Sequence, residues 1–315
     1  MKSVILVGTG AKDPERFLEL GIPVVTTWQA ADLIDNTHPN YFGRPGIWGA
    51  RLPNMVLGKA EVVQQEGGRL CGWTLGWDAK VNLGKASPDP EWMAQCRAWK
   101  EQFPAIEPGL HDDPPGGIHP WRFTQALQRY FLEDEIIVTD MGSALVAAHQ
   151  VLMLKPPQRL MTSGGLGEMG VGLPAAIGAS FARSKGRVIC LHCDGGMMMN
   201  LQELQTIAHH QLPIRIIVYD NQSYGMIKQT QEIAGYEHSG SDLEGDMSIP
   251  DLVSVSRAFG LLSAEVRTWE DFERVVPKIL ARNEPSVIVY RFPYVGLWPK
   301  VVPQSEGLWD TCPRV

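Results

Sequence analysis

Short apolar, β-branched runs recur along the chain, and most are followed by a turn and a segment with helical periodicity. In the first third, residues 2–7 and 22–27 are such runs, and a helical pattern begins between them at Pro14. A strand, a helix and a second strand at this spacing predict a parallel βαβ unit. Further along we expect a helix over 52–59, a third strand over 61–64 and a helix over 92–102.

The alternation is interrupted by a segment of turn-forming residues between 104 and 117. Four prolines and three glycines fall within it, and both residue types break helices and strands. A length of 315 residues also agrees with two domains, at about 150 residues each. We therefore expect a small first α/β domain over 1–103, a linker over 104–117, a second domain over 118–302 and an irregular tail over 303–315.

Beyond the linker, strands and helices alternate regularly. We expect strands over 135–139, 187–192, 214–219 and 286–290, and helices over 119–131, 143–152, 173–183, 200–210, 250–259 and 270–281. The strand runs are continuously apolar, as in parallel strands buried on both faces. The pattern predicts an α/β fold with a doubly wound, mostly parallel sheet, beside a smaller Rossmann-like first domain. Ligands of such a sheet bind at the carboxyl ends of its strands.

Two of these strands end in residues suited to a metal ion and an anion. Cys193, Asp194, Gly195 and Gly196 follow the strand over 187–192, and Asp220 and Asn221 end the next strand. Carboxylate and amide oxygens suit Mg²⁺ or Ca²⁺, and glycine N–H groups before a helix suit an anion. Asp and Asn at strand ends also cap turns, which would explain either residue alone. The pair, with 24 residues between Gly195 and Asp220, predicts a metal-bridged diphosphate site.

This stretch resembles the thiamine-diphosphate motif, in which Gly-Asp-Gly is followed at a similar distance by Asn-Asn. Residues 163–178, 199–213 and 221–231 are also similar to the acetolactate synthase-like branch of the thiamine-diphosphate enzymes, and the resemblance is spread over about the last 200 residues. Two positions differ, because Cys193 replaces the first motif glycine and Asp220 the first motif asparagine. Neither position supplies a metal-ligating side chain in the family.

The resemblance implies a site for thiamine diphosphate and Mg²⁺. Its implied metal ligands are Asp194, Asn221 and the backbone carbonyl of Ser223. Met169 is expected to press between the two rings of the cofactor, a role that Leu or Ile could also fill, and Gly167 to contact the pyrimidine. With Gly167 and Met169, the implied cofactor contacts are Gly142, Ser143, Gly195, Gly196, Tyr224, Gly225 and Met226. Gln229, with Tyr224 and Met226, is a candidate for the substrate side; a solvent-facing helix start is the alternative interpretation.

The resemblance also implies a reaction, which is decarboxylation of a 2-oxo acid and transfer of the acyl group to a second carbonyl. The segments over 4–12 and 21–28 resemble the central domain of these enzymes, so the chain looks like their carboxyl-terminal half. The pyrimidine-binding domain, with its cofactor-activating Glu, is expected on a partner subunit within a dimer-based oligomer, and Glu168 is not expected to replace that Glu. Two alternatives stay open: a simple 2-oxo acid decarboxylase subunit, and a non-catalytic cofactor-binding protein.

The first domain raises the question of further cofactors. Some relatives bind FAD in the central domain, but residues 71–90 leave little room here, so FAD is doubtful. Arg44, Gly46 and Arg51 are interpreted as loop residues rather than as remnants of a flavin site. The run over 7–11 lacks the third glycine of a dinucleotide fingerprint, which makes a dehydrogenase a weaker alternative. Thr230 stands where acetohydroxyacid synthases tend to have Trp, which favours a relative of those enzymes.

The composition of the chain argues against some classes of binding partner and favours one cellular location. The net charge of −7 argues against a chain that coats nucleic acid or anionic lipid. No apolar run reaches the roughly 18 residues of a membrane span. Five cysteines without framework spacing favour a reducing, cytoplasmic location. Four tryptophans are expected to pack in a core or an interface: Trp73, Trp77, Trp92 and Trp99.

Overall fold

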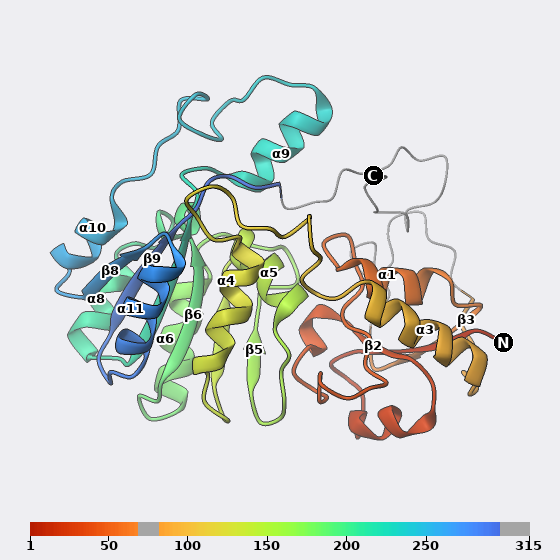
Figure 1. The fold of residues 1–315 in the computed structure, drawn as a ribbon. Helices are drawn as coiled ribbons and strands as arrows, with labels where there is room; N and C mark the ends of the chain where they lie inside the picture. Colours follow the sequence, from red (N-terminus) through yellow and green to blue (C-terminus); the bar gives the residue numbers. More distant parts are fainter. Residues whose placement is uncertain (69–81, 297–315) are drawn as a thin grey trace. The chain divides into compact units, whose positions relative to one another are not determined.

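The computed structural model describes residues 1–68 and 82–296, which divide into two compact units (Figure 1). The first contains Met1–Leu110 and His149–Pro157, and the second His111–Ala148 and Gln158–Leu297. The segment His149–Pro157 therefore groups with the first unit, although it follows the expected linker in sequence. The expected tail over 303–315, Trp73 and Trp77 lie outside the described residues.

The first unit is built on a three-stranded parallel sheet. Its strands are β1 (Ser3–Val7), β2 (Val24–Thr26) and β3 (Val62–Glu66), in the order β2-β1-β3. The expected parallel unit is confirmed, but its connecting helix η1 (Pro14–Leu20) is a 3-10 helix. Left-handed residues stand at both of its ends, Asp13 with φ 47° and Gly21 with φ 66°.

Both faces of this sheet are covered. Alternate residues of a strand point to opposite faces, so Val4 and Leu6 pack with Val56 and Trp92 on one side. Ile5 and Val7 pack with Phe17 and other residues on the opposite side. The remaining helices of the unit are η2 (Trp28–Ala30), α1 (Arg51–Gly58) and α3 (Pro90–Gln102).

Arg44 joins two segments of the first unit. Its buried guanidinium donates hydrogen bonds to the carbonyl oxygens of His149 at 2.7 Å and Leu152 at 3.0 Å, and to Asn36 Oδ1. These carbonyls lie at the end of α5 (Ser143–Val151) and just beyond it, where a helix lacks internal donors. Arg44 is therefore a structural residue of the loop, in agreement with its interpretation from sequence.

The glycine loop after β1 packs directly against the backbone that follows β3. Gly8 N–H donates to Glu66 O at 2.8 Å and Gly10 N–H to Gly67 O at 2.7 Å. A Cβ on Gly8 would lie 2.2 Å from Gly68 Cα, so a side chain at position 8 would clash with backbone. Two N–H groups that a nucleotide phosphate would use in a Rossmann loop are engaged within the protein.

The second unit is built on a six-stranded parallel sheet with the order β5-β4-β6-β7-β9-β8. Its strands are β4 (Ile136–Thr139), β5 (Arg159–Met161), β6 (Val188–Cys193), β7 (Ile214–Asp220), β8 (Leu262–Val266) and β9 (Ser286–Arg291). Its helices are α4 (Pro120–Leu127), η3 (Gln128–Tyr130), most of α5, α6 (Gly172–Ala182), α7 (Asp194–Met197), α8 (Glu203–His210), α9 (Gly225–Ala234), α10 (Leu252–Ala258) and α11 (Trp269–Leu280). The expected doubly wound α/β class is confirmed.

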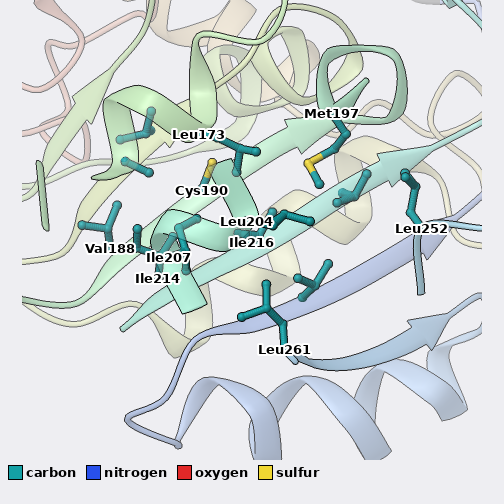
Figure 2. Packing of buried hydrophobic residues seen from close by; sticks show 14 of the residues in the cluster. Leu173, Val188, Cys190, Met197, Leu204, Ile207, Ile214, Ile216, Leu252 and Leu261 are labelled. Atoms are coloured by element: carbon teal, nitrogen blue, oxygen red, sulfur yellow. The ribbon is translucent and has the colours of Figure 1, made fainter. Parts of the chain in front are cut away.

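Helices cover both faces of this sheet. On one face, Cys190 of β6 and Ile216 of β7 belong to a buried cluster with residues of α6, α8 and α10 (Figure 2). On the other face, Phe123 of α4 stacks on Tyr290 of β9 at 3.7 Å and meets Phe272 of α11 edge-on at 5.4 Å. This packing explains why the central strands are continuously apolar. No helix among the described residues is long and apolar enough to cross a membrane.

The strand order places a switch point between β4 and β6. The chain passes from β4 outward to β5 and then returns to β6 on the other side of β4. Loops that leave β4 and β6 at their carboxyl ends therefore run in opposite directions and open a crevice. Asp140 follows β4 directly, and Asp194 follows β6.

Candidate functional site

Asp194 and Asn221 lie together at the carboxyl edge of the second sheet. Strands β6 and β7 are parallel neighbours, with Cys193 opposite Tyr219. Asp194 Oδ2 accepts a hydrogen bond from Asn221 N–H at 3.1 Å, and its Oδ1 accepts one from Gly195 N–H at 2.7 Å. The two strand ends therefore meet as the sequence predicts.

The residues after Asp220 form a tight turn. Asn221 Oδ1 accepts hydrogen bonds from both the N–H and the hydroxyl of Ser223, each at 3.1 Å. Gln222 has a φ of 56°, and its N–H and side-chain amide both donate to Asp220 Oδ1. Asp220 thus holds the turn that brings Asn221 and Ser223 to the site.

Buried negative charge accumulates at this edge. The Asp194 side chain is nearly inaccessible, and this burial together with the neighbouring charge of Asp220 raises the pKa of Asp194 to about 7. Arg291 is the nearby cation, with its Nε 3.6 Å from Asp220 Oδ2, but it is shared with Glu265 at 2.8 Å and Asp251 at 3.0 Å. A divalent cation would neutralise the negative charge of the buried Asp194 carboxylate. The oxygen donors at this edge therefore fit Mg²⁺.

Gly195 lies between two side chains from other elements. A Cβ at this position would stand 2.2 Å from Tyr224 Cε1 and 3.0 Å from Met169 Cε. Met169 comes from the loop before α6, and Tyr224 stands at the N-terminus of α9. The structure therefore brings Met169 and Tyr224 together at the glycine turn after β6.

Gly142 and Ser143 form the turn between β4 and α5. Gly142 has a φ of 116°, and a Cβ there would lie 2.8 Å from Cys193 Sγ. The buried Cys193 thiol also accepts a hydrogen bond from Ala144 N–H at 3.4 Å. Cys193, which departs from the family motif, thus packs against the start of α5, where Ser143 is the first residue.

Gly167 and Glu168 belong to the loop that carries Met169. Gly167 has a φ of 70°, and a Cβ there would lie 2.1 Å from Met141 Cε, so the loop contacts the segment after β4. Glu168 is exposed and accepts a hydrogen bond from the Ser163 hydroxyl, which lowers the pKa of Glu168. Glu168 is therefore a surface carboxylate in this structure.

Helix α9 carries the candidates for the substrate side. It begins at Gly225. The N–H of the preceding residue, Tyr224, donates a hydrogen bond to Ser241 O at 2.8 Å. Met226 is half-buried, while Gln229 is 7% exposed. Gln229 therefore points into the protein, and a solvent-facing helix start describes Ile227 and Thr230 rather than Gln229.

Asp140 is a site residue that the sequence reasoning missed. Its carboxylate is fully buried at the end of β4, and a Cβ on Gly196 would lie 1.7 Å from Asp140 Oδ2. Burial raises the pKa of Asp140, whereas its neighbour His192 has a lowered pKa for the same reason. The available signal was an acidic residue directly after an expected strand, two positions before Gly142.

Comparison with known proteins gives the class of this site. Residues 140–290 match the thiamine pyrophosphate enzyme family, in its C-terminal TPP binding domain. This matched segment contains Asp140 after β4, the Asp194–Asn221 contact and Met169.

The particular relatives are acetolactate synthases. The chain is 26% identical to the acetolactate synthase isozyme 2 large subunit of Escherichia coli K12, over 91% of the chain and 58% of that protein. It is 26% identical to the mitochondrial acetolactate synthase catalytic subunit of Saccharomyces cerevisiae, over 91% of the chain and 50% of that protein. A large subunit from Parasynechococcus marenigrum is 33% identical over 62% of the chain. The chain thus spans less than three fifths of the length of these relatives.

Proposed function

We propose that this chain holds thiamine diphosphate and Mg²⁺ in an enzyme that decarboxylates a 2-oxo acid and transfers the acyl group to a second carbonyl. The observation that carries the proposal is the meeting of Asp194 and Asn221 beside a glycine turn, at the carboxyl ends of the neighbouring strands β6 and β7. The family of residues 140–290 and the acetolactate synthase relatives support it.

In this proposal the metal is held by Asp194, the Asn221 side-chain oxygen and the Ser223 carbonyl. Backbone groups of Gly195 and Gly196, with those of Gly142 and Ser143, hold the diphosphate. When bound, the cofactor supplies the carbon nucleophile and the electron sink for decarboxylation.

Three other residues surround the reacting part of the ligand. Met169, whose methyl group lies near Gly195, supports a bent cofactor by packing, and Gly167 contacts the pyrimidine. Tyr224, Met226 and the inward-pointing Gln229 line the substrate side. A largely apolar, water-poor environment favours loss of carbon dioxide.

The activating Glu is proposed to come from a pyrimidine-binding domain on a partner subunit of a dimer-based assembly. Glu168 is unsuited to that role because it is exposed and ionised at the surface. FAD is not part of the proposal, because the two loop N–H groups after β1 are engaged by the carbonyls of Glu66, the last residue of β3, and Gly67, which follows it. The substrates are small acids and carbonyl compounds rather than nucleic acid or lipid.

The test is to purify the chain, identify polypeptides that copurify, and assay pyruvate turnover with Mg²⁺ and thiamine diphosphate. Carbon dioxide release that depends on a second carbonyl compound supports the proposal. Release of free aldehyde without an acceptor would select the simple decarboxylase, and cofactor binding without turnover with any partner would select a non-catalytic protein.

The matched variants are Asp194→Ala and Asp134→Ala. The first removes a proposed metal ligand and should weaken magnesium-dependent cofactor binding by about 100-fold or more. The second removes an exposed carboxylate that precedes the amino end of β4, whereas the site lies at the carboxyl ends of the strands, and should leave binding unchanged. Wild-type affinity in Asp194→Ala contradicts the metal assignment.

A further inference from the structure

The peptide group of Gly170 is held from both sides by side chains of other elements. Its N–H donates to Asp140 Oδ1 at 2.8 Å, and its carbonyl accepts a hydrogen bond from Asn200 Nδ2 at 2.8 Å. Gly172 N–H donates to the same Asp140 oxygen at 3.2 Å. Gly170 directly follows Met169, so these contacts fix the backbone on the carboxyl side of Met169.

The backbone at Gly170 has little freedom to adopt another arrangement. Gly170 is buried and has a φ of 89°, and a Cβ on it would lie 2.6 Å from Met199 Cβ. Only glycine fits this position without strain. Position 170 therefore requires glycine, and the hydrogen bonds between the Gly170 peptide and the Asp140 and Asn200 side chains hold its backbone in place.

Asp140 also contacts the other half of the site. Its Oδ2 occupies the space where a side chain on Gly196 would stand, and lies 3.4 Å from His192 Nδ1. A buried carboxylate is unfavourable unless its hydrogen bonds repay the loss of water. Here Oδ1 of the carboxylate is hydrogen bonded to the Met169 loop, while Oδ2 lies against the glycine turn after β6.

We propose that Asp140 and Asn200 are positioning residues that direct the Met169 side chain toward Gly195, and so select the bent conformation of the bound cofactor. This proposal rests on the proposed function, because it assigns Met169 a role against thiamine diphosphate. Asp140 and Asn200 act through the Gly170 peptide rather than by touching the ligand.

The hydrogen bonds are tested first, without ligand, by amide hydrogen exchange of the full 315-residue chain. Asp140→Ala should speed exchange at Gly170 and Gly172 by about tenfold or more, whereas Asp140→Asn keeps an oxygen acceptor and should largely restore protection. Gln205→Ala, an exposed change on α8, is the control. Unchanged exchange in Asp140→Ala overturns the proposal.

The positioning role is tested with two probes, Mg²⁺ with inorganic pyrophosphate and Mg²⁺ with thiamine diphosphate. Asn200→Ala leaves the buried carboxylate in place and is the variant expected to fold most readily. It should weaken thiamine diphosphate binding by about tenfold and pyrophosphate binding by less than about twofold. Because Asn200 acts through Met169, the loss should disappear when Met169→Ala is already present.

Two failures are distinguishable. Equal losses for both probes, or losses that add in the double variant, refute the positioning role and leave the proposed function standing. A wild-type chain that binds neither probe contradicts the proposed function, and with it the role of Met169 on which the positioning depends. The exchange experiment reports on the Gly170 hydrogen bonds in either case.

Discussion

The side chain of Asp194, directly after β6, accepts a hydrogen bond at 3.1 Å from the backbone N–H of Asn221, directly after β7. This contact joins the two strand ends across the edge of the sheet. It also fixes one carboxylate oxygen in a buried position close to Asp220, which is the origin of the raised pKa of Asp194. The next two predictions follow from this arrangement.

The metal-free chain should lose stability as the pH rises from about 4 to about 7. The pKa of Asp194 is about 7 in the folded chain, against 3.8 as the ordinary value, so the folded state binds the extra proton in this window. Stability falls with pH wherever the folded state holds more protons, here by up to about 4 kcal/mol. Chemical denaturation at several pH values measures it, and Asp194→Asn should flatten the curve; an unchanged curve would show that Asp194 ionises normally.

Asp220→Asn should shift this pH dependence to lower pH. The substitution removes the negative charge next to Asp194, while an amide oxygen can still accept the hydrogen bonds from Gln222. Glu265→Gln is the matched control, because Glu265 shares Arg291 with Asp220 but is not among the groups that raise the pKa of Asp194. The idea fails if the two variants give the same profile.

Gly196→Ala should destabilise the second unit by about 3 kcal/mol. The new Cβ would lie 1.7 Å from Asp140 Oδ2, a side chain held by the backbone of Gly170 and Gly172. Gly178→Ala on α6 is the control, since nothing lies within 4 Å of its added Cβ, and it should be neutral or stabilise by about 0.5 to 1 kcal/mol. Thermal melting compares the two; equal melting temperatures would mean that Asp140 moves freely.

Arg44→Ala should destabilise the first unit by about 3 kcal/mol, because it leaves the carbonyls of His149 and Leu152 without their buried donor. Arg44→Lys should recover only part of the loss, since an ammonium group cannot reproduce the planar fork. Arg16→Ala, at an exposed position, serves as the control. Unfolding in denaturant measures the effect, and a loss no larger than that of Arg16→Ala would contradict it.

The sequence predicted the central strands well because burial on both faces makes them continuously apolar. It missed β5 (Arg159–Met161) and β8 (Leu262–Val266), whose burial is too broken for such a run. It also missed α7 (Asp194–Met197), a single turn of glycine and aspartate. The expected helix after Pro14 is a 3-10 helix, because a short apolar repeat does not distinguish the two helix types.

For the candidate site, the sequence located Asp194 and Asn221 because the strands that carry them follow one another and pair. Asp140 could not be placed in the same way. Its contact with Gly170, 30 positions away, depends on β4 lying beside β6. The spacing of residues along the sequence does not determine the order of strands in the sheet. Gln229 was left between two interpretations, and its burial was decided by how α9 packs.

Gly8 and Gly68 meet through their main chains alone, with no side chain between them. An effort to engineer nucleotide recognition into the first unit would therefore gain nothing from added lysines or arginines at this edge. It would first have to separate the loop after β1 from the end of β3, so that the N–H groups of Gly8 and Gly10 no longer donate to their carbonyl acceptors. Insertion of residues after Glu66, rather than substitution, is the route that this geometry leaves open.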